Sequence, residues 1–364
     1  MCSFFNLFLR LAVLSVISLF LVCGELFAGT IEKKGRIEIQ NMDDSEEYVD
    51  EDEPVAAIRR PLPVYLSQLS NLNDYCIFAN GGWDGNWYVG FNVCWIEEMP
   101  IPPEGNYVRA YVGAKLGRAK TRVVSGKPGW EKEAIPGDIY VSLSSTPAWR
   151  SSQKYFLTDT GDIPLEGDAE NALEGVGESR WFWTEVPVNA VSPDSPSYIA
   201  LWSPTDFLMS TSSSPILAGG WGSQKVNSWL NNDVFGYAPL NPANARKTAI
   251  SAFEPAIAVK LIPEGADQEI KVSIDAIKDG REKTSNKTLI VSVSGEEIEK
   301  AWLEISTDDK QWKKYGRPVY GSPYMFTMKT ENLSEGRASI RCAAQDVWGN
   351  IGYSQKTEIS ISKK

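Results

Sequence analysis

The chain has 364 residues, which is more than one typical domain needs and predicts two domains. Its formal net charge of −11 argues against a nucleic-acid partner, because phosphate binding requires a basic face. The chain contains no histidine, which excludes Ser-His-Asp and Cys-His catalysis and every histidine-ligated metal site. GxSxG, phosphate-loop and CxxC motifs are missing too, so we expect a non-enzymatic protein without a cofactor.

Residues 1–29 have the layout of a secretory signal peptide. Arg10 precedes an apolar stretch from Leu11 to Cys23, and the small residues Ala28 and Gly29 follow. The stretch is shorter than the roughly 20 residues that cross a bilayer, so a retained anchor is the weaker alternative. The mature protein is therefore predicted to be secreted, periplasmic or on the cell surface, with no membrane span after signal removal.

Residues 30–60 contain the acidic run DDSEEYVDEDE, followed by RRPLP, with almost no apolar periodicity. Such a composition cannot bury enough apolar surface to order itself, and it predicts a flexible acidic spacer. An interaction tail is the alternative.

Residues 61–263 contain short alternating segments separated by Gly, Pro, Asn, Asp and Ser. Apolar residues occupy every second position in 108–116, 139–143 and 257–261. This period of two is typical of strands with one buried face and differs from the helical period of 3.6. The pattern predicts a β-sandwich domain whose long loops carry its function.

Two cysteines of this domain flank a predicted hairpin. Asp84, Gly85 and Asn86 supply turn chemistry midway between Cys76 and Cys94. A turn centred on Gly85 places the two cysteines opposite each other, and export exposes them to an oxidising compartment. We predict a Cys76–Cys94 disulfide, with two buried thiols as the alternative. The same alternation assigns one face to the core, namely Trp87, Val89, Phe91, Val93 and Trp95.

Carboxylates offer a catalytic alternative, because a glycosidase needs only two acids. The acids in EGDAE resemble the ExDxE signature of laminarinase-like jelly-roll glycosidases, a resemblance that implies catalysis by Glu166 and Glu170. The residues between the acids are small here, whereas that family has apolar ones, so we predict a solvated loop. Calcium binding by this loop, with Asp159 and Asp162, is a further alternative to the prediction of no metal site.

Tryptophan is concentrated in this domain. Flat aromatic rings stack on sugar faces, while Asp, Asn and Gln hold hydroxyl groups. The segments GGWDGNW and GGWGSQKVNSWLNND therefore predict contacts with a polysaccharide or cell-envelope glycan through Trp83, Asp84, Asn86, Trp221 and Trp229. A place in the core is the alternative for each ring. Ten of the 13 tryptophans lie here: Trp83, Trp87, Trp95, Trp130, Trp149, Trp181, Trp183, Trp202, Trp221 and Trp229.

Residues 264–364 again alternate in the segments LIVSVS, AWLEIS and ASIRCAA. Their spacing predicts a second sandwich, with Cys342 as a buried thiol and Trp302 on an outer face. EKAWLEISTDDKQWKKY and LSEGRASIRCAAQDVWGNIGY resemble the bacterial immunoglobulin-like and fibronectin-like domains of exported proteins, in which an Asp-rich turn precedes a Trp and AxDxxGN precedes the last strand. The resemblance implies a spacer or adhesive unit.

The first domain resembles, more loosely, the jelly-roll sandwiches of bacterial surface proteins and carbohydrate-active enzymes. The likeness rests on SRWFWTEVPVNAVSPDSPSYIALWS, where an aromatic strand, a Pro-rich turn and a Tyr-led strand follow one another. We thus expect an all-β protein, a jelly-roll-like sandwich followed by an immunoglobulin-like one. The expected function is an exported non-enzymatic binding or cell-surface module, with a carboxylate-type glycosidase or a purely structural surface subunit as alternatives.

Overall fold

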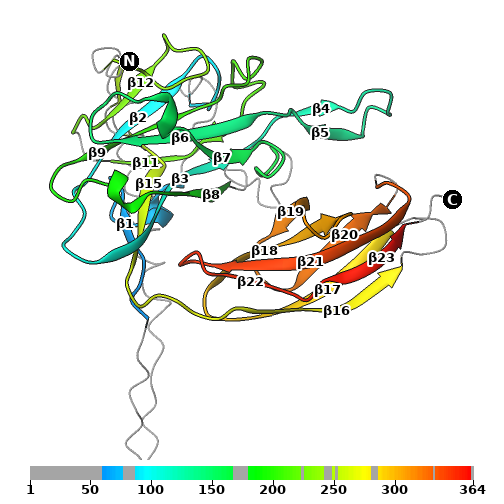
Figure 1. The fold of residues 1–364 in the computed structure, drawn as a ribbon. Helices are drawn as coiled ribbons and strands as arrows, with labels where there is room; N and C mark the ends of the chain where they lie inside the picture. Colours follow the sequence, from blue (N-terminus) through cyan, green and yellow to red (C-terminus); the bar gives the residue numbers. More distant parts are fainter. Residues whose placement is uncertain are drawn as a thin grey trace, which may run out of the picture. The chain divides into compact units, whose positions relative to one another are not determined.

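A computed structural model describes residues 60–76, 87–166, 179–222, 225–241, 248–250, 253–279, 286–330 and 333–361. Within these ranges the regular elements are strands and three short 3-10 helices, and no α-helix occurs (Figure 1). The prediction of an all-β chain is confirmed. No helix in the described ranges is long and apolar enough to cross a membrane. The predicted signal peptide and nearly all of the predicted spacer lie outside these ranges.

Two larger sheets form the part that precedes residue 264. The first has the order β1-β15-β3-β10, with β8 also paired to β3, and the second has the order β13-β12-β2-β9-β6-β7. The first sheet consists of β1 (Val64–Leu66), β3 (Tyr107–Gly117), β8 (Ser179–Val186), β10 (Ile216–Leu217) and β15 (Ile257–Pro263). The second consists of β2 (Cys94–Met99), β6 (Asp138–Ser144), β7 (Tyr155–Asp159), β9 (Ser197–Trp202), β12 (Ser228–Asn231) and β13 (Thr248–Ile250).

Two short strand pairs and three 3-10 helices accompany these sheets. Two strand pairs are β4 (Thr121–Val123) with β5 (Lys132–Ala134) and β11 (Gly219–Trp221) with β14 (Phe253–Pro255). The 3-10 helices are η1 (Leu72–Asp74), η2 (Ser151–Gln153) and η4 (Val188–Ala190).

One apolar core lies where the inner sides of both larger sheets meet. The predicted alternation holds in β6 and β15, whose inward residues are buried, and in β3 from Ala110 onward. Val108 is 48% exposed because β3 begins only at Tyr107, ahead of the covered part of the sheet. The inward residues confirmed in this way are Ala110, Val112, Ala114, Leu116, Ile139, Val141, Leu143, Ile257, Val259 and Leu261.

A second cluster covers the opposite side of β2 and its neighbours. Because both sides of this sheet are buried, the alternation of β2 does not separate core from surface. Three of the ten tryptophans of this domain lie here, where the rings pack with Cys94 and Ile96. The tryptophans of this cluster are Trp149, Trp202 and Trp229.

Two further sheets are built from residues that follow 264. Their orders are β16-β17-β20 and β19-β18-β21-β22, with β23 also paired to β21. The inner residues of both sheets form a separate core, so the two large cores lie on either side of the predicted boundary at 263/264. The strands are β16 (Lys271–Asp279), β17 (Asn286–Ser294), β18 (Ile298–Ser306), β19 (Lys313–Val319), β20 (Tyr324–Lys329), β21 (Gly336–Asp346), β22 (Ile351–Tyr353) and β23 (Thr357–Ile361).

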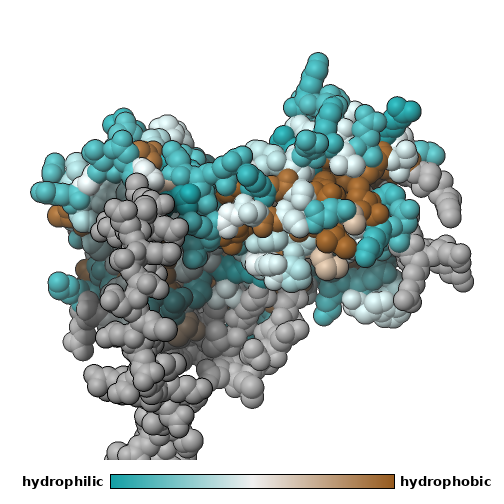
Figure 2. Space-filling model, turned by 90° about the horizontal axis from the view of Figure 1, so that it is seen from below, coloured by the Kyte–Doolittle hydropathy of each residue, from teal (hydrophilic) through white to brown (hydrophobic). Residues whose placement is uncertain are grey.

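The pattern predicted for this second core is confirmed. Leu289, Ala301, Leu303 and Ile340 are all 1% exposed or less, and the ring of Trp302 lies outside the core, half-buried. Some apolar surface remains on the outer face of β17 and β20, where Ile290 lies opposite the 52% exposed Met325. Apolar side chains gather on the face of the molecule drawn in Figure 2.

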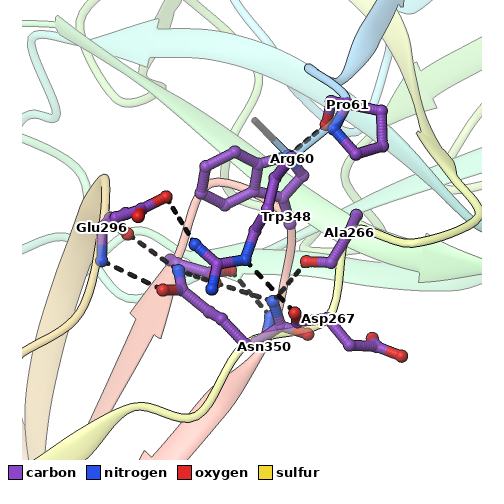
Figure 3. A network of polar contacts seen from close by, with 9 residues as sticks. Arg60, Pro61, Ala266, Asp267, Glu296, Trp348 and Asn350 are labelled. Atoms are coloured by element: carbon purple, nitrogen blue, oxygen red, sulfur yellow. Dashed lines mark hydrogen bonds and ion pairs between the residues drawn. The ribbon is translucent and has the colours of Figure 1, made fainter. Parts of the chain in front are cut away.

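The turn between β21 and β22 packs against β3 and β15 in a small apolar cluster separate from both cores. Trp348 at this turn is 2% exposed and packs with Tyr111, Ile262 and Ala266. Its Nε1 donates a hydrogen bond to the Pro61 carbonyl oxygen at 2.8 Å (Figure 3). The Trp of the AxDxxGN-like stretch therefore fixes a contact between segments nearly 290 positions apart in the chain.

Polar contacts surround this tryptophan. Asp346 holds the turn, because its Oδ1 accepts the backbone N–H of Asn350 at 2.8 Å and its Oδ2 accepts Asn350 Nδ2 at 2.8 Å. Arg60 donates from Nε to the Asp267 carbonyl oxygen at 3.2 Å and pairs with Glu296 at 2.5 Å (Figure 3). The Asp and Asn of the motif are thus structural residues of a buried turn.

The predicted Cys76–Cys94 disulfide is wrong in this structure. All three cysteines of the described ranges are free, with Cys76 exposed and Cys94 fully buried. Cys94 begins β2, whose partners are β9 and β12, so the strand that pairs beside it comes from much later in the chain. The residues of the predicted turn lie outside the described ranges. Cys342 is the buried thiol that the sequence predicts.

We therefore expect the mature protein to carry three reduced thiols of unequal reactivity. Burial raises the pKa of the Cys94 thiol above its ordinary value and that of Cys342 to about 12, so neither is a thiolate at neutral pH. A maleimide should label only Cys76 in the native protein and all three thiols after unfolding. Intact-mass and peptide mass spectrometry check this, and a disulfide in the freshly purified protein would contradict it.

Candidate functional site: an exposed aromatic ribbon

A short ribbon of β11 and β14 presents an aromatic pair, in which Trp221 is exposed and Phe253 is half-buried. Trp221 lies directly opposite Phe253 across the two strands, with ring centroids 4.0 Å apart and ring planes at 34°. Trp221 is 66% exposed, although a ring of this size is usually covered when a neighbouring core can take it. One broad aromatic surface therefore faces solvent.

A chain of rings anchors this pair to the core. Phe253 meets the edge of Trp87 at 5.9 Å, and Trp87 lies 5.0 Å from the fully buried Trp95. Trp87 also packs against the first core from its margin. The exposed ring of Trp221 thus rests on a supported neighbour, which keeps its orientation defined without burying its outer face.

Two glycines allow the ribbon to lie close to its neighbours. A Cβ atom on Gly219 would come within 2.7 Å of the Trp87 ring, and one on Gly220 within 2.8 Å of the Asp74 carbonyl oxygen. Larger residues would push β11 away from both. Residues 219–221, GGW, thus form a strand whose glycines bring Trp221 to its place.

The same two contacts flank the segment 77–86. Asp74 precedes this segment and Trp87 follows it, and the Trp87 carbonyl oxygen accepts the N–H of Leu217 at 2.9 Å. Asp74 and Trp87 themselves therefore lie beside β10 and β11. The predicted ligand residues Trp83, Asp84 and Asn86 belong to the segment and lie outside the described ranges.

The prediction of a ligand contact at Trp229 is corrected. Trp229 is 7% exposed and belongs to the cluster on the far side of β2, next to Cys94 and Ile96. Its ring faces are covered by protein, so it cannot stack on a sugar. Trp130, at 82% exposure, is the other strongly exposed tryptophan of the described ranges, and it lies beside the β4–β5 pair.

A second pair of aromatic rings, Trp181 and Trp183, packs against other protein groups. Trp181 and Trp183 of β8 stack on each other at 5.2 Å and 14°, and Lys260 Nζ lies 4.9 Å from the Trp183 ring. Trp183 also borders the cluster around Trp348. Their faces already have partners, which sets them apart from Trp221.

The described residues give no geometric support to the two alternatives for the acidic loop, a glycosidase site and a calcium site. Glu166 forms an ion pair with Lys120, and Glu170 lies outside the described ranges. Asp159 Oδ1 accepts the N–H of Gly161 at 2.8 Å, and Asp162 pairs with Lys314. In the described part of the chain, no group of three or more His, Cys, Asp or Glu side chains is placed to hold a metal ion.

The sequence analysis missed a buried pair of acids near the ribbon, Glu97 of β2 and Glu254 of β14. They are 0% and 2% exposed. Burial raises the pKa of Glu97 well above its usual value, and the charge of Glu254 raises it further. Burial likewise raises the pKa of Glu254 to about 7, although hydrogen bonds from Ser228 and Asn227 oppose the shift. The sequence did indicate that Glu97 is buried, because it occupies the next inward position after Val93 and Trp95.

Comparisons with known proteins add little to this geometry. No family model matches the chain, and no curated protein sequence matches it. A polysaccharide deacetylase from Bacillus cereus is 13% identical, with 26% of this chain and 31% of that chain covered and a TM-score of 0.21. The glycoside hydrolase domain of Endo-D from Streptococcus pneumoniae is 8% identical, with 73% and 31% covered and a TM-score of 0.24.

A β-1,2-glucanase from Parabacteroides distasonis is similar to the same extent, at 10% identity, with 73% of this chain and 30% of that chain covered and a TM-score of 0.23. The chain thus spans about a third of the length of each of these proteins. At such TM-scores the likeness carries no conclusion about this chain.

Proposed function

We propose that this chain is an exported, non-enzymatic module that binds a polysaccharide or cell-envelope glycan on the ribbon of Trp221 and Phe253. The observation that carries the proposal is the 66% exposed ring of Trp221, held by Phe253 at 4.0 Å. A ring that is fixed in place but open on one face can stack on a sugar with little loss of side-chain entropy. Asp74 and Trp87, which flank the Trp-, Asp- and Asn-containing segment 77–86 in the chain, both contact the glycines of β11.

The remaining parts of the proposal follow from the sequence. The leader at 1–29 favours export to the periplasm, the cell surface or the medium. A jelly-roll-like sandwich at 61–263 would present the ribbon, and an immunoglobulin-like sandwich at 264–364 would act as a spacer. The missing histidine and the ion pair made by Glu166 favour binding over hydrolysis.

Retention on insoluble polysaccharides and peptidoglycan tests this function. We expect the mature protein to bind at least one glycan of the panel and Trp221→Ala to bind it about 10-fold more weakly, which corresponds to about 1.4 kcal/mol. Trp130→Ala is the matched control, because it removes a tryptophan that is even more exposed, at 82%, and that does not belong to the ribbon. The control should bind as the unchanged protein does.

Two results would contradict the proposal. Equal retention of Trp221→Ala and the unchanged protein would show that the ribbon is not the binding surface. Retention on none of the glycans would leave the structural surface subunit as the better account.

A further inference from the structure

Glu97 occupies a position that the fold reserves for apolar side chains. It lies between Trp95 and Met99 on the inward side of β2, and both of these are buried in the first core. Neither Oε1 nor Oε2 of Glu97 has a hydrogen-bond partner, and the side chain is 0% exposed. An uncompensated carboxylate in such a place costs several kcal/mol of stability.

The cross-strand neighbour of Glu97 belongs to a small group of polar side chains. Ser228 of β12 lies directly opposite Glu97 in the sheet, so the two side chains share one face. Ser228 Oγ lies 3.0 Å from Glu254 Oε2 and 3.1 Å from Asn227 Oδ1. Ser228 thus lies opposite the unpartnered acid and is hydrogen-bonded to a second buried acid, whose charge acts on Glu97.

We propose that Glu97 and Glu254 bind a divalent cation inside the first domain, with Asn227 and Ser228 as neutral oxygen ligands. Calcium fits best, because it takes carboxylate, amide and hydroxyl oxygens in a flexible geometry. A set of oxygens without Cys or His disfavours zinc and copper. Two carboxylates balance the charge of one divalent ion.

A cation satisfies this site better than protons do. Protonation would remove the charge of each acid, but no protein group in the described ranges accepts a proton from Glu97 or donates one to it. Among the residues that the structure describes, no lysine or arginine acts on either acid through its charge. One ion between the carboxylates would remove their repulsion and occupy the lone pairs of Glu97 in a single step.

The metal content and calcium affinity of the mature protein test the proposal. After chelation and desalting, isothermal titration calorimetry with calcium chloride at pH 7.5 should give one site per chain. The Tm should rise with calcium, and the rise should shrink at pH 5, because protons compete for the same carboxylates. Magnesium should bind more weakly, because it demands a stricter octahedral geometry.

Glu97→Gln and Glu254→Gln each keep the size of the side chain and remove one charge. Either change should weaken calcium binding at least about 10-fold, since affinity follows the number of charged ligands. Glu166→Gln, at an exposed acid that pairs with Lys120, should leave it unchanged. A chain that binds no calcium, or that binds it equally well after Glu97→Gln, would overturn the proposal. A Tm that responds to pH but not to calcium would also overturn it and assign the site to protons.

Discussion

Replacing Trp348 by alanine is expected to lower the free energy of unfolding by about 3 to 5 kcal/mol, the usual cost of truncating a buried aromatic side chain. The ring is 2% exposed and fills the space between Tyr111, Ile262 and Ala266. The change also leaves the Pro61 carbonyl oxygen without its indole donor. Urea unfolding followed by circular dichroism gives the difference directly.

Trp302→Ala is the matched control for this change. Trp302 lies in the same part of the chain but is only half-buried, and its Nε1 donates to Glu304 Oε1 at 2.9 Å. We expect it to cost much less, about 1 kcal/mol. If Trp348→Ala cost no more than the control, the packing of this turn against β3 and β15 would not stabilise the protein.

Raising the pH in the presence of a chelator is expected to lower the free energy of unfolding. The pKa of Glu254 is raised from 4.5 to about 7 by burial, and that of Glu97 is raised well above 4.5. The folded state therefore holds protons that the unfolded state has released, so stability is greatest below about pH 4.5 and declines toward pH 7 and beyond. For Glu254 alone the decline is on the order of 3 kcal/mol, at about 1.36 kcal/mol per pKa unit.

The other titratable groups at this place should not reverse the sign. Burial raises the pKa of Tyr75, as does the charge of Glu97, so the phenol stays neutral throughout. Burial lowers the pKa of Lys115, whose Nζ donates to the Tyr75 carbonyl oxygen at 2.7 Å. Urea midpoints measured from pH 4.5 to 8 provide the profile.

The variant Glu97→Leu separates the contribution of this acid to the pH dependence of stability from the contributions of other groups. It places an apolar side chain at an inward position of β2, so we expect a flatter profile and a higher stability at pH 8. A stability that rises from pH 5 to 8 in the chelated, unchanged protein would contradict the assignment of raised pKa values.

The sequence predicted the strands well because one physical rule controls them. In β3, β6 and β15, the residues that face the first core are apolar and recur with a period of two. The rule loses its power in β2, where Cys94 and Ile96 are as deeply buried as Trp95. There, loops cover the second side of the sheet, and the sequence of β2 alone does not predict that this side is buried. Trp229 was wrongly predicted to contact a ligand because its burial on this second side could not be foreseen.

Long-range pairing explains the other errors. The disulfide required the segments beside Cys76 and Cys94 to pair with each other, but β2 pairs with β9 and β12. The turn residue Trp348 meets Pro61, at the opposite end of the described chain, and no local rule predicts that contact. Trp221 was predicted as a ligand contact because its segment combines tryptophan with Gln, Asn and Asp residues. No feature of the sequence indicated Phe253, whose ring supports that of Trp221.

Hydroxyl-radical footprinting of the mature protein, with and without the glycan that retains it, tests the central claim most directly. Oxidation of each tryptophan is read by peptide mass spectrometry. Trp221 and Trp130 should both oxidise readily in the free protein, because they are 66% and 82% exposed. The glycan should slow the oxidation of Trp221 and leave that of Trp130 unchanged. Equal oxidation of Trp221 in the free and the bound protein would contradict a glycan stacked on the ribbon.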